Sequence, residues 1–560
     1  MSRRGGLLAI LISAACCSKS EVKGGGSSDP AAPTKPSFAL FALAETRGQI
    51  GPCGCTSDPL GDIARTAKVV EDARAVGPVL VLDAGSLLYS KSPMPEHLAA
   101  QEELTADLLI ATYKQPLQVA AIGLGPADLA RGADHVRPAR QAVNVAADAK
   151  LAVEPPHVIH VGAAEVGVFG VIAEDAVAGL AITDPVAAGK TAVAQLRKQG
   201  AQVVVGLVQA GSKKDAVKLV RDIGGIDLAI GGLGLAAPEP ERVEIEPQKV
   251  GDGWLVIPAN RGQVVSKLLV TVRGPGGFAN AIGPAAAAAK TAEIDKQLAA
   301  LDADLAKFAA DKDADPKFVE QKRQERAQLA AERTRLAANP TVVPASGNYF
   351  TLEQVRIAKT LACDPKVQDD VTAFYRAAGE ANVKAADDIA VTPPPKGVAG
   401  YAGMESCGDC HSDAVEFWKN TVHSHAWKTL VDRGQQFDYE CIGCHVTGWD
   451  KPGGSNLAHN DTLRDIQCET CHGPGSFHVA KLGEEKPLAI RRAPPEDLCA
   501  TQCHTKEHSD TFDLKPYLRD VVGPGHGEQL RKQLGDGPTG SQLRKAALSK
   551  AGRLGAGCVR

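Results

Sequence analysis

The stretch Cys407-Gly408-Asp409-Cys410-His411 reads C-x-x-C-H, and the chain repeats it at Cys441-Ile442-Gly443-Cys444-His445 and Cys468-Glu469-Thr470-Cys471-His472. Two thiols separated by two residues can form thioethers with the two vinyl groups of one haem. The histidine that follows can then ligate the iron from one side. One such motif is modest evidence, but three in one short region predict a segment built around covalently bound haem c.

A fourth motif departs from this spacing. In Cys499-Ala500-Thr501-Gln502-Cys503-His504, three residues separate the cysteines. Because the loop can bulge while the histidine stays next to the second cysteine, we expect a fourth haem here, with His504 as its ligand. Structural zinc and disulfides are the alternatives, but neither requires a histidine directly after every second cysteine.

The sixth ligand of each iron has to come from another histidine. The region offers six candidates, namely His423, His425, His459, His478, His508 and His526. His425, on a predicted helix after the first motif, and His478, six residues after His472, are our first choices, followed by His423 and His508. Any one of them could instead be an ordinary surface histidine. An iron with two histidine ligands suits electron transfer, whereas an open position can bind a small molecule.

This region resembles the multihaem module of the cytochrome c-552/c-554 family. The resemblance is carried by ESCGDCH, W-x-x-x-x-H-S-H-A, ECIGCHVTGWD, QCETCHGPGSFH and LCATQCHTKEHS, and we assign residues 404–516 to the module. It implies closely packed haems, mostly with two histidine ligands, that transfer electrons. We expect redox partner proteins, such as other cytochromes or quinol-linked donors. A haem-dependent enzyme of the nitrogen-oxide or hydroxylamine type is the alternative.

The N-terminus has the pattern of an export signal. Arg3 and Arg4 precede the apolar run 7–12, which is too short to span a bilayer. Residues 1–16 resemble a bacterial lipoprotein signal with Cys16 as the lipid-bearing residue, although Ser13 stands where that family prefers Leu, so a plain cleaved signal is the alternative. Residues 17–37 are a Gly/Ser/Pro-rich flexible tether. We therefore expect a periplasmic or outer-membrane lipoprotein of a Gram-negative bacterium.

The rest of the chain predicts a multidomain protein, α/β first and mostly α afterwards. The net charge of −4 argues against nucleic-acid binding. Short apolar runs alternate with helical stretches over 38–285, which predicts an α/β domain. The apolar runs are 38–44, 78–82, 118–122, 157–161, 166–172, 202–208, 226–230, 255–258 and 267–272. Later segments read as a helical hairpin (286–340), a return to the α/β body (341–390), a linker (391–403) and, after the module, a basic tail (517–560).

The α/β region resembles a degraded metallophosphatase domain of the 5′-nucleotidase type. Segments 41–48, 82–86, 123–129, 208–211, 230–234 and 258–263 stand in the order of that family's landmarks. Two-metal hydrolysis needs a set of Asp, His and Asn ligands. Here Arg47, Gln209 and Leu233 or Leu235 replace expected ligands, while Glu45, Asp83 and Asp128 remain acidic. The resemblance implies an α/β sandwich scaffold without phosphatase activity, and an active metal-dependent phosphohydrolase is the less favoured alternative.

One cysteine pair stays unexplained by these patterns. Cys53 and Cys55, in Pro52-Cys53-Gly54-Cys55, could form a disulfide, ligate a metal or act as a redox centre. A purely structural role is the simpler interpretation. Cys363 and Cys558 are isolated in the sequence, and no role is predicted for them.

Overall fold

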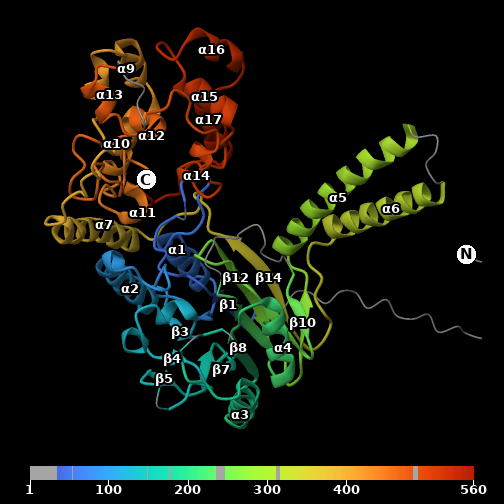
Figure 1. The fold of residues 1–560 in the computed structure, drawn as a ribbon. Helices are drawn as coiled ribbons and strands as arrows, with labels where there is room; N and C mark the ends of the chain where they lie inside the picture. Colours follow the sequence, from blue (N-terminus) through green and yellow to red (C-terminus); the bar gives the residue numbers. More distant parts are fainter. Residues whose placement is uncertain are drawn as a thin grey trace, which may run out of the picture.

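The computed structural model describes residues 35–52, 54–147, 149–174, 176–177, 179–234, 246–310, 316–483 and 490–559. The predicted signal at 1–16, most of the tether, Cys16, Cys53 and Leu235 lie outside them. No helix in these ranges combines the length and the apolar character that crossing a bilayer requires. Figure 1 shows an α/β body, a long helical arm, and a helical C-terminal region on top of the body.

Two six-stranded sheets form the body. The first has the order β13-β14-β12-β1-β2-β3, and the second β10-β11-β9-β8-β7-β6. The first-sheet strands are β1 (Phe38–Leu43), β2 (Val79–Asp83), β3 (Val119–Ile122), β12 (Val264–Thr271), β13 (Phe278–Ala281) and β14 (Asn348–Arg356). The second-sheet strands are β6 (His157–Val161), β7 (Ala164–Ile172), β8 (Val203–Gln209), β9 (Leu228–Gly232), β10 (Gln248–Val250) and β11 (Gly253–Val256). A separate small sheet pairs β4 (Arg140–Gln141) with β5 (Val153–Glu154).

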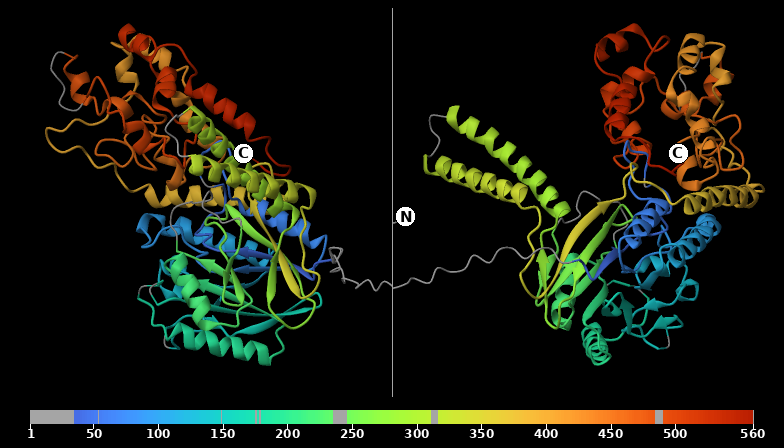
Figure 2. Two further views of the ribbon diagram at one scale, coloured as in Figure 1. Left: turned by 90° about the vertical axis from the view of Figure 1, so that its right-hand side faces the viewer. Right: turned by 180° about the vertical axis from the view of Figure 1, so that it is seen from behind.

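The two sheets pack face to face with helices outside. Leu40 and Leu82 of the first sheet share one fully buried cluster with Val205 and Leu207 of the second. Strands covered on both faces read as continuous apolar runs, which is why the sequence revealed them. Helices α1 (Ile63–Arg74), α2 (Ala99–Lys114) and α7 (Pro365–Ala386) cover the first sheet, and α3 (Pro185–Lys198) and α4 (Lys213–Ile223) cover the second (Figure 2). The predicted α/β sandwich is confirmed.

Among its described residues the body also contains three short 3₁₀ segments, η1 (Glu96–Leu98), η2 (Pro126–Leu129) and η3 (Ala133–His135). Asp62 starts α1 as its N-cap, because its side chain accepts hydrogen bonds from the backbone N–H groups of Ala64 and Arg65. The parallel strands β1, β2 and β3 run side by side, as do β7, β8 and β9. Their carboxyl ends therefore bring several polar loops together.

The arm consists of α5 (Pro284–Ala310) and α6 (Pro316–Ala338), which pack along each other and project from the body (Figure 1). Ile294 and Leu336 are buried between them near the base. Ion pairs join Arg326 to Asp302 and Arg333 to Asp295 along the exposed flank. After the arm, β14 pairs antiparallel with β12, so the chain returns to the first sheet.

The C-terminal region is made of short helices joined by long loops. These are α8 (Glu405–Gly408), α9 (Ser412–Trp418), η5 (Val422–His425), α10 (Ala426–Val431), α11 (Tyr439–Ile442), α12 (Cys468–His472), α13 (Ser476–Ala480) and α14 (Leu498–Gln502). Its main buried cluster is small, with Ile442, Val446 and Leu457 against Ala386 of α7. So little apolar burial is typical of small modules that a cofactor or cross-link completes.

The segment after 517 is more than a basic tail. It contributes to α15 (Leu514–Val521) and forms α16 (Glu528–Leu534) and α17 (Gly540–Lys550). A disulfide joins Cys558 to Cys363, just before α7 of the body. No local pattern predicted this bond, because the two cysteines lie 195 residues apart.

Candidate functional site

Each cysteine motif lies on or beside one turn of a short helix. Residues three or four apart share a helix face, so both thiols of a motif can point to the same side. In the first motif the His411 N–H donates to the Cys407 carbonyl at 2.9 Å, an ordinary four-residue turn. In the fourth, the His504 N–H donates to the Cys499 carbonyl at 2.7 Å, five residues back. The extra residue therefore widens the turn in the manner of a π-bulge and leaves the histidine after the second cysteine.

Three of the four motif histidines have Nδ1 held by an oxygen. His445 Nδ1 lies 2.5 Å from the Ala426 carbonyl, His472 Nδ1 2.8 Å from the Arg491 carbonyl, and His504 Nδ1 3.1 Å from the Ser509 hydroxyl. A carbonyl only accepts, so Nδ1 must carry the proton in the first two, and Nε2 keeps its lone pair in the neutral ring. Metal-ligating histidines are usually oriented by such a bond.

Burial favours the neutral form of His445 and His504. It lowers the pKa of His445, and burial together with the neighbouring His423 lowers the pKa of His504 to about 4. Because an imidazole must be unprotonated to ligate a metal, both rings are ready to do so at neutral pH.

Two motif histidines each face a second imidazole. The ring centres of His411 and His478 are 6.3 Å apart with planes 21° from parallel, and those of His423 and His504 are also 6.3 Å apart. A metal–imidazole bond is about 2 Å and the ring centre lies about 1.2 Å beyond the nitrogen, so two imidazoles on opposite sides of one metal are about 6.4 Å apart. Both pairs therefore have the separation that one iron between them requires.

His526 lies within electrostatic range of the third motif. Burial, with a smaller effect of the nearby His472, lowers the pKa of His526. Nδ1 of His526 and Nδ1 of His478 are buried without a hydrogen-bond partner among the described residues.

The second and third motifs differ from the first and fourth. Among the described residues, no ring contact brings a second imidazole to His445 or to His472. The predicted distal residue His425 has its Nδ1 2.7 Å from the Ser424 hydroxyl, and His508 Nδ1 lies 2.8 Å from the Thr505 hydroxyl. The structure thus places His478 and His423 opposite motif histidines, and leaves His425 and His508 in local contacts.

Thiols from different motifs lie next to each other. Cys407 is in hydrogen-bond contact with Cys468, and Cys444 with Cys503, while Cys471 interacts electrostatically with Cys499. The first and third motifs are therefore neighbours, and so are the second and fourth. None of the eight motif cysteines forms a disulfide in this structure. Haems attached to these cysteines would therefore lie close to one another.

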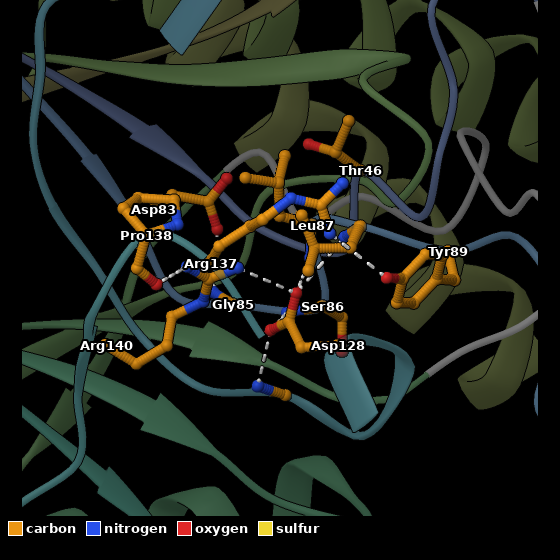
Figure 3. A network of polar contacts seen from close by, with 12 residues as sticks. Thr46, Asp83, Gly85, Ser86, Leu87, Tyr89, Asp128, Arg137, Pro138 and Arg140 are labelled. Atoms are coloured by element: carbon orange, nitrogen blue, oxygen red, sulfur yellow. Dashed lines mark hydrogen bonds and ion pairs between the residues drawn. The ribbon is translucent and has the colours of Figure 1, made fainter. Parts of the chain in front are cut away.

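A second polar cluster lies in the body, at the carboxyl ends of its parallel strands (Figure 3). Asp128 accepts hydrogen bonds from the backbone N–H groups of Ser86, Leu87, Leu88 and Gly125, and pairs with Arg140 at 3.2 Å. Asp83 accepts from the Tyr113 hydroxyl at 2.6 Å and from the Gly85 N–H at 2.7 Å. Both carboxylates are fully buried. Protein donors thus satisfy the groups that a cation would need.

The remaining acidic residue of this cluster is satisfied in the same way. Glu45 accepts from Gln209 Nε2 at 2.9 Å and from the Gly234 N–H at 3.1 Å, and pairs with Arg47 at 3.5 Å. Burial raises the pKa of Glu45 to about 7 and that of Asp83 to about 6. Arg47 and Gln209 thus supply the donors around Glu45. The described residues contain no group of three or more His, Cys, Asp and Glu arranged to hold a metal ion.

Comparison with known proteins separates the two regions. Residues 406–473 match the family model "Cytochrome c554 and c-prime". Cytochrome c-554 of Nitrosomonas europaea is 31% identical over 119 residues, 18% of this chain and 51% of the relative, so the chain spans about half of that relative's length. The C-terminal module is thus similar to cytochrome c554 over residues 406–473.

Two solved structures resemble the cytochrome module and the body. Reduced cytochrome c554 of Nitrosomonas europaea shares 25% identity over 19% of this chain and 65% of its own, with a TM-score of 0.16. A 5′-nucleotidase precursor of Thermus thermophilus is similar at 14% identity, with 75% of this chain and 83% of its own covered and a TM-score of 0.40.

The body holds the cytochrome module through contacts that the sequence did not reveal. The side chain of Asn382 on α7 donates to Gln101 Oε1 on α2 at 2.7 Å and to the Phe437 carbonyl at 2.9 Å. Gln101 in turn donates to Asp438 at 3.0 Å, and Asp438 caps the helix of the second motif. These residues look unremarkable in the sequence, since only the packing of α2 against α7 makes them neighbours.

Proposed function

We propose that this chain is an exported multihaem c-type cytochrome that transfers electrons. Its cysteines would bind haem c at Cys407/Cys410, Cys441/Cys444, Cys468/Cys471 and Cys499/Cys503. The observation that carries the proposal is the pair of facing imidazoles, His411 with His478 and His423 with His504, each at 6.3 Å. Bound haem supplies a one-electron couple whose potential depends on its axial ligands and its burial.

The residues of this chain hold and orient the group. The thiols fix it covalently, and the Ala426 and Arg491 carbonyls hold the Nδ1 protons of His445 and His472 so that Nε2 is free to ligate. His478 and His423 are the proposed second ligands of the first and fourth sites. The contacts between thiols of different motifs support closely spaced groups, and hence transfer from one site to the next.

Haem content tests the proposal directly. A pyridine haemochrome assay and the intact mass of the mature protein should give four haems per chain. Changing both Cys499 and Cys503 to Ser should remove one of the four and leave the other three. A colourless mature protein without a Soret band would overturn the assignment.

Export is supported by the bond at the C-terminus as well as by the signal. The Cys363–Cys558 disulfide is the kind of cross-link that persists in an oxidising compartment. Together with the predicted lipid on Cys16, it favours a periplasmic or outer-membrane lipoprotein whose partners are other cytochromes or quinol-linked donors. Labelling with radioactive palmitate should mark the wild type and leave Cys16→Ser unlabelled.

The body is proposed to be a scaffold without phosphatase activity. Its three acidic residues are already occupied by Tyr113, Gln209, Arg140 and backbone donors. Two-metal hydrolysis needs such carboxylates free for cations. Hydrolysis of a nucleotide or phosphomonoester with added Mn²⁺ should stay at background. Activity that disappears in Asp83→Asn would refute the scaffold assignment.

A redox enzyme is the second candidate. Neither His445 nor His472 has a facing imidazole among the described residues, so a haem at the second or third motif would keep one position for a small ligand. EPR of the oxidised protein should then show a high-spin iron beside the low-spin ones. Four low-spin signals, unchanged by nitric oxide or cyanide, would rule out the redox enzyme and leave electron transfer as the proposed function.

A further inference from the structure

The histidine of the fourth motif is held by a side chain. His504 Nδ1 lies 3.1 Å from the Ser509 hydroxyl. At the second and third motifs the corresponding oxygen belongs to a backbone carbonyl. A carbonyl only accepts a hydrogen bond, whereas a hydroxyl accepts one and donates another. The bond to His504 therefore depends also on the group to which Ser509 donates.

Ser509 is the first of three linked hydroxyl groups. Its Oγ lies 3.3 Å from the Tyr517 hydroxyl, which in turn lies 2.7 Å from Thr511 Oγ1. Ser509 is buried, so bulk water competes poorly for its hydroxyl. Its N–H donates to the Thr505 carbonyl at 2.8 Å, and this turn brings the hydroxyl back to His504.

Aromatic rings fix the plane of the His504 ring. The Phe512 ring stacks on it, with centres 4.9 Å apart and planes 10° from parallel. The Tyr517 ring meets His504 edge-on at 5.1 Å and Phe512 edge-on at 5.0 Å. A Cβ on Gly540 would lie 2.4 Å from the Tyr517 ring, so α17 packs directly against this cluster. His504 is thus held in its plane by a hydrogen bond and across its face by stacking.

The segment that carries Ser509 is also tied to the body. Arg544 of α17 contacts Asp510 at 2.9 Å and donates to the Thr56 carbonyl of the body at 3.0 Å. Asp510 also accepts from the Ser57 N–H at 2.9 Å. Because Asp510 directly follows Ser509, these bonds limit how far the hydroxyl can move from His504.

The direction of the hydrogen bonds follows from the ligand role of His504. When the neutral ring binds iron through the lone pair of Nε2, its one N–H proton is on Nδ1. Nδ1–H then donates to Ser509 Oγ, which leaves the Ser509 hydroxyl free to donate to Tyr517. Tyr517 can donate to Thr511 in the same way. Hydrogen bonds that run in one direction strengthen one another.

A stronger bond at Nδ1 makes the imidazole a more basic ligand, and this stabilises ferric over ferrous iron. We propose that Ser509, supported by Tyr517 and Thr511, is a positioning residue of the fourth haem site, which orients His504 and lowers the reduction potential of that haem. This rests on the proposed haem binding. Ser509 acts only through His504 and is not itself a ligand.

Reduction potentials of the haem-loaded protein test this role. Potentiometric titration followed by absorption should show one haem step at a higher potential in Ser509→Ala than in the wild type. We expect the equilibrium constant for reduction of that haem to rise by up to about tenfold, or about 59 mV for one electron. Ser509→Thr keeps the hydroxyl and should keep the wild-type potential. Identical potentials in the wild type and Ser509→Ala would overturn the proposal.

Tyr517→Phe tests the other hydroxyls while keeping the aromatic ring. It should shift the same step in the same direction but by less, since Ser509 still accepts from His504. This variant also decides the matter if Ser509→Ala does not fold. Ser541→Ala, at an exposed position on α17, is the matched control and should change no potential. An unshifted step in Tyr517→Phe would overturn the role given to Tyr517 and Thr511.

A variant without the fourth haem shows whether the effect passes through His504. In Cys499→Ser/Cys503→Ser, the further change Ser509→Ala should alter none of the remaining potentials. A shift of the same size in that background would overturn the proposal. A purely structural role of Ser509 would instead lower the melting temperature and leave every potential at its wild-type value.

The haem count keeps this result apart from that of the proposed function. If the wild type carries its haems and Ser509→Ala leaves every potential unchanged, only the positioning role fails. If the wild type contains no haem, the proposed function itself fails.

Discussion

The body and the C-terminal module differ in how much apolar surface they bury. In the body, two sheets bury a large apolar cluster that includes Leu40, Leu82 and Val205. In the module, the main cluster has only Ile442, Val446 and Leu457 against Ala386 of the body. The body therefore has a core that its own side chains can fill, whereas the C-terminal module buries little apolar surface of its own. We propose that haem supplies the rest.

The largest effect should come from withholding haem. Without the haem-attachment machinery, the cysteines of the module stay free and its small core cannot offset the entropy of ordering its long loops. Limited proteolysis should then degrade residues 404–516 and leave the body intact. A haem-free module that resists protease would mean that it folds without haem, as the body does.

A cavity in the core should affect mainly the body. Leu82 is fully buried between the sheets, and its replacement by Ala should cost about 2–5 kcal/mol. Urea unfolding followed by circular dichroism should show the loss in the body's transition, while the haem content stays at the wild-type value. The exposed Leu530→Ala change is the control and should shift neither.

The disulfide tests how strongly the two regions are joined. Cys363–Cys558 closes a segment that contains the whole module, and bonds of this kind contribute about 2–5 kcal/mol. The double change Cys363→Ser/Cys558→Ser should lower the melting temperature of the haem-loaded protein. It should also expose α17 to protease before any other helix. An unchanged melting temperature would mean that the bonds of Arg544 and Gln101 suffice to hold the regions together.

The smallest effect concerns pH and the body alone. Burial raises the pKa of Glu45 to about 7, so the folded state binds a proton more tightly than the unfolded state. This contribution is fully present below the unfolded pKa of about 4.5 and is lost as pH rises through about 7. Wild type should thus lose about 1–3 kcal/mol between pH 5 and 8, whereas Glu45→Gln should lose less. Chemical denaturation of both proteins at both pH values measures the free energy of unfolding. An equal loss in the wild type and in Glu45→Gln would contradict a buried neutral Glu45.

Much of this arrangement could be predicted from local sequence signals. The nine apolar runs correspond to β1, β2, β3, β6, β7, β8, β9, β11 and β12, because a strand covered on both faces must be apolar throughout. The strand β14 was missed, since its run is interrupted by Thr351, Glu353 and Gln354. The helical arm was visible because its apolar residues repeat at helical spacing.

In the candidate site too, only features formed by residues close together in the chain could be predicted. The motif cysteines and histidines follow each other in the chain, so spacing alone identified them. The histidines that face each other are far apart in the chain, so spacing did not identify them. His425 was preferred to His423 as a second ligand because of its position in a predicted helix. In the structure His423 faces His504, which lies 81 residues further along the chain. Loop paths of that length leave no periodic signal.

By itself the sequence determined the cysteine–histidine motifs, the apolar strands of the body and the helical arm, because each depends on residues close together in the chain. The tertiary structure alone decided which histidines face each other, that Cys363 meets Cys558, and that Gln101 and Asn382 hold the second motif. The physical reason is that these contacts join segments far apart in sequence, and only the packing of the module onto the body brings them together.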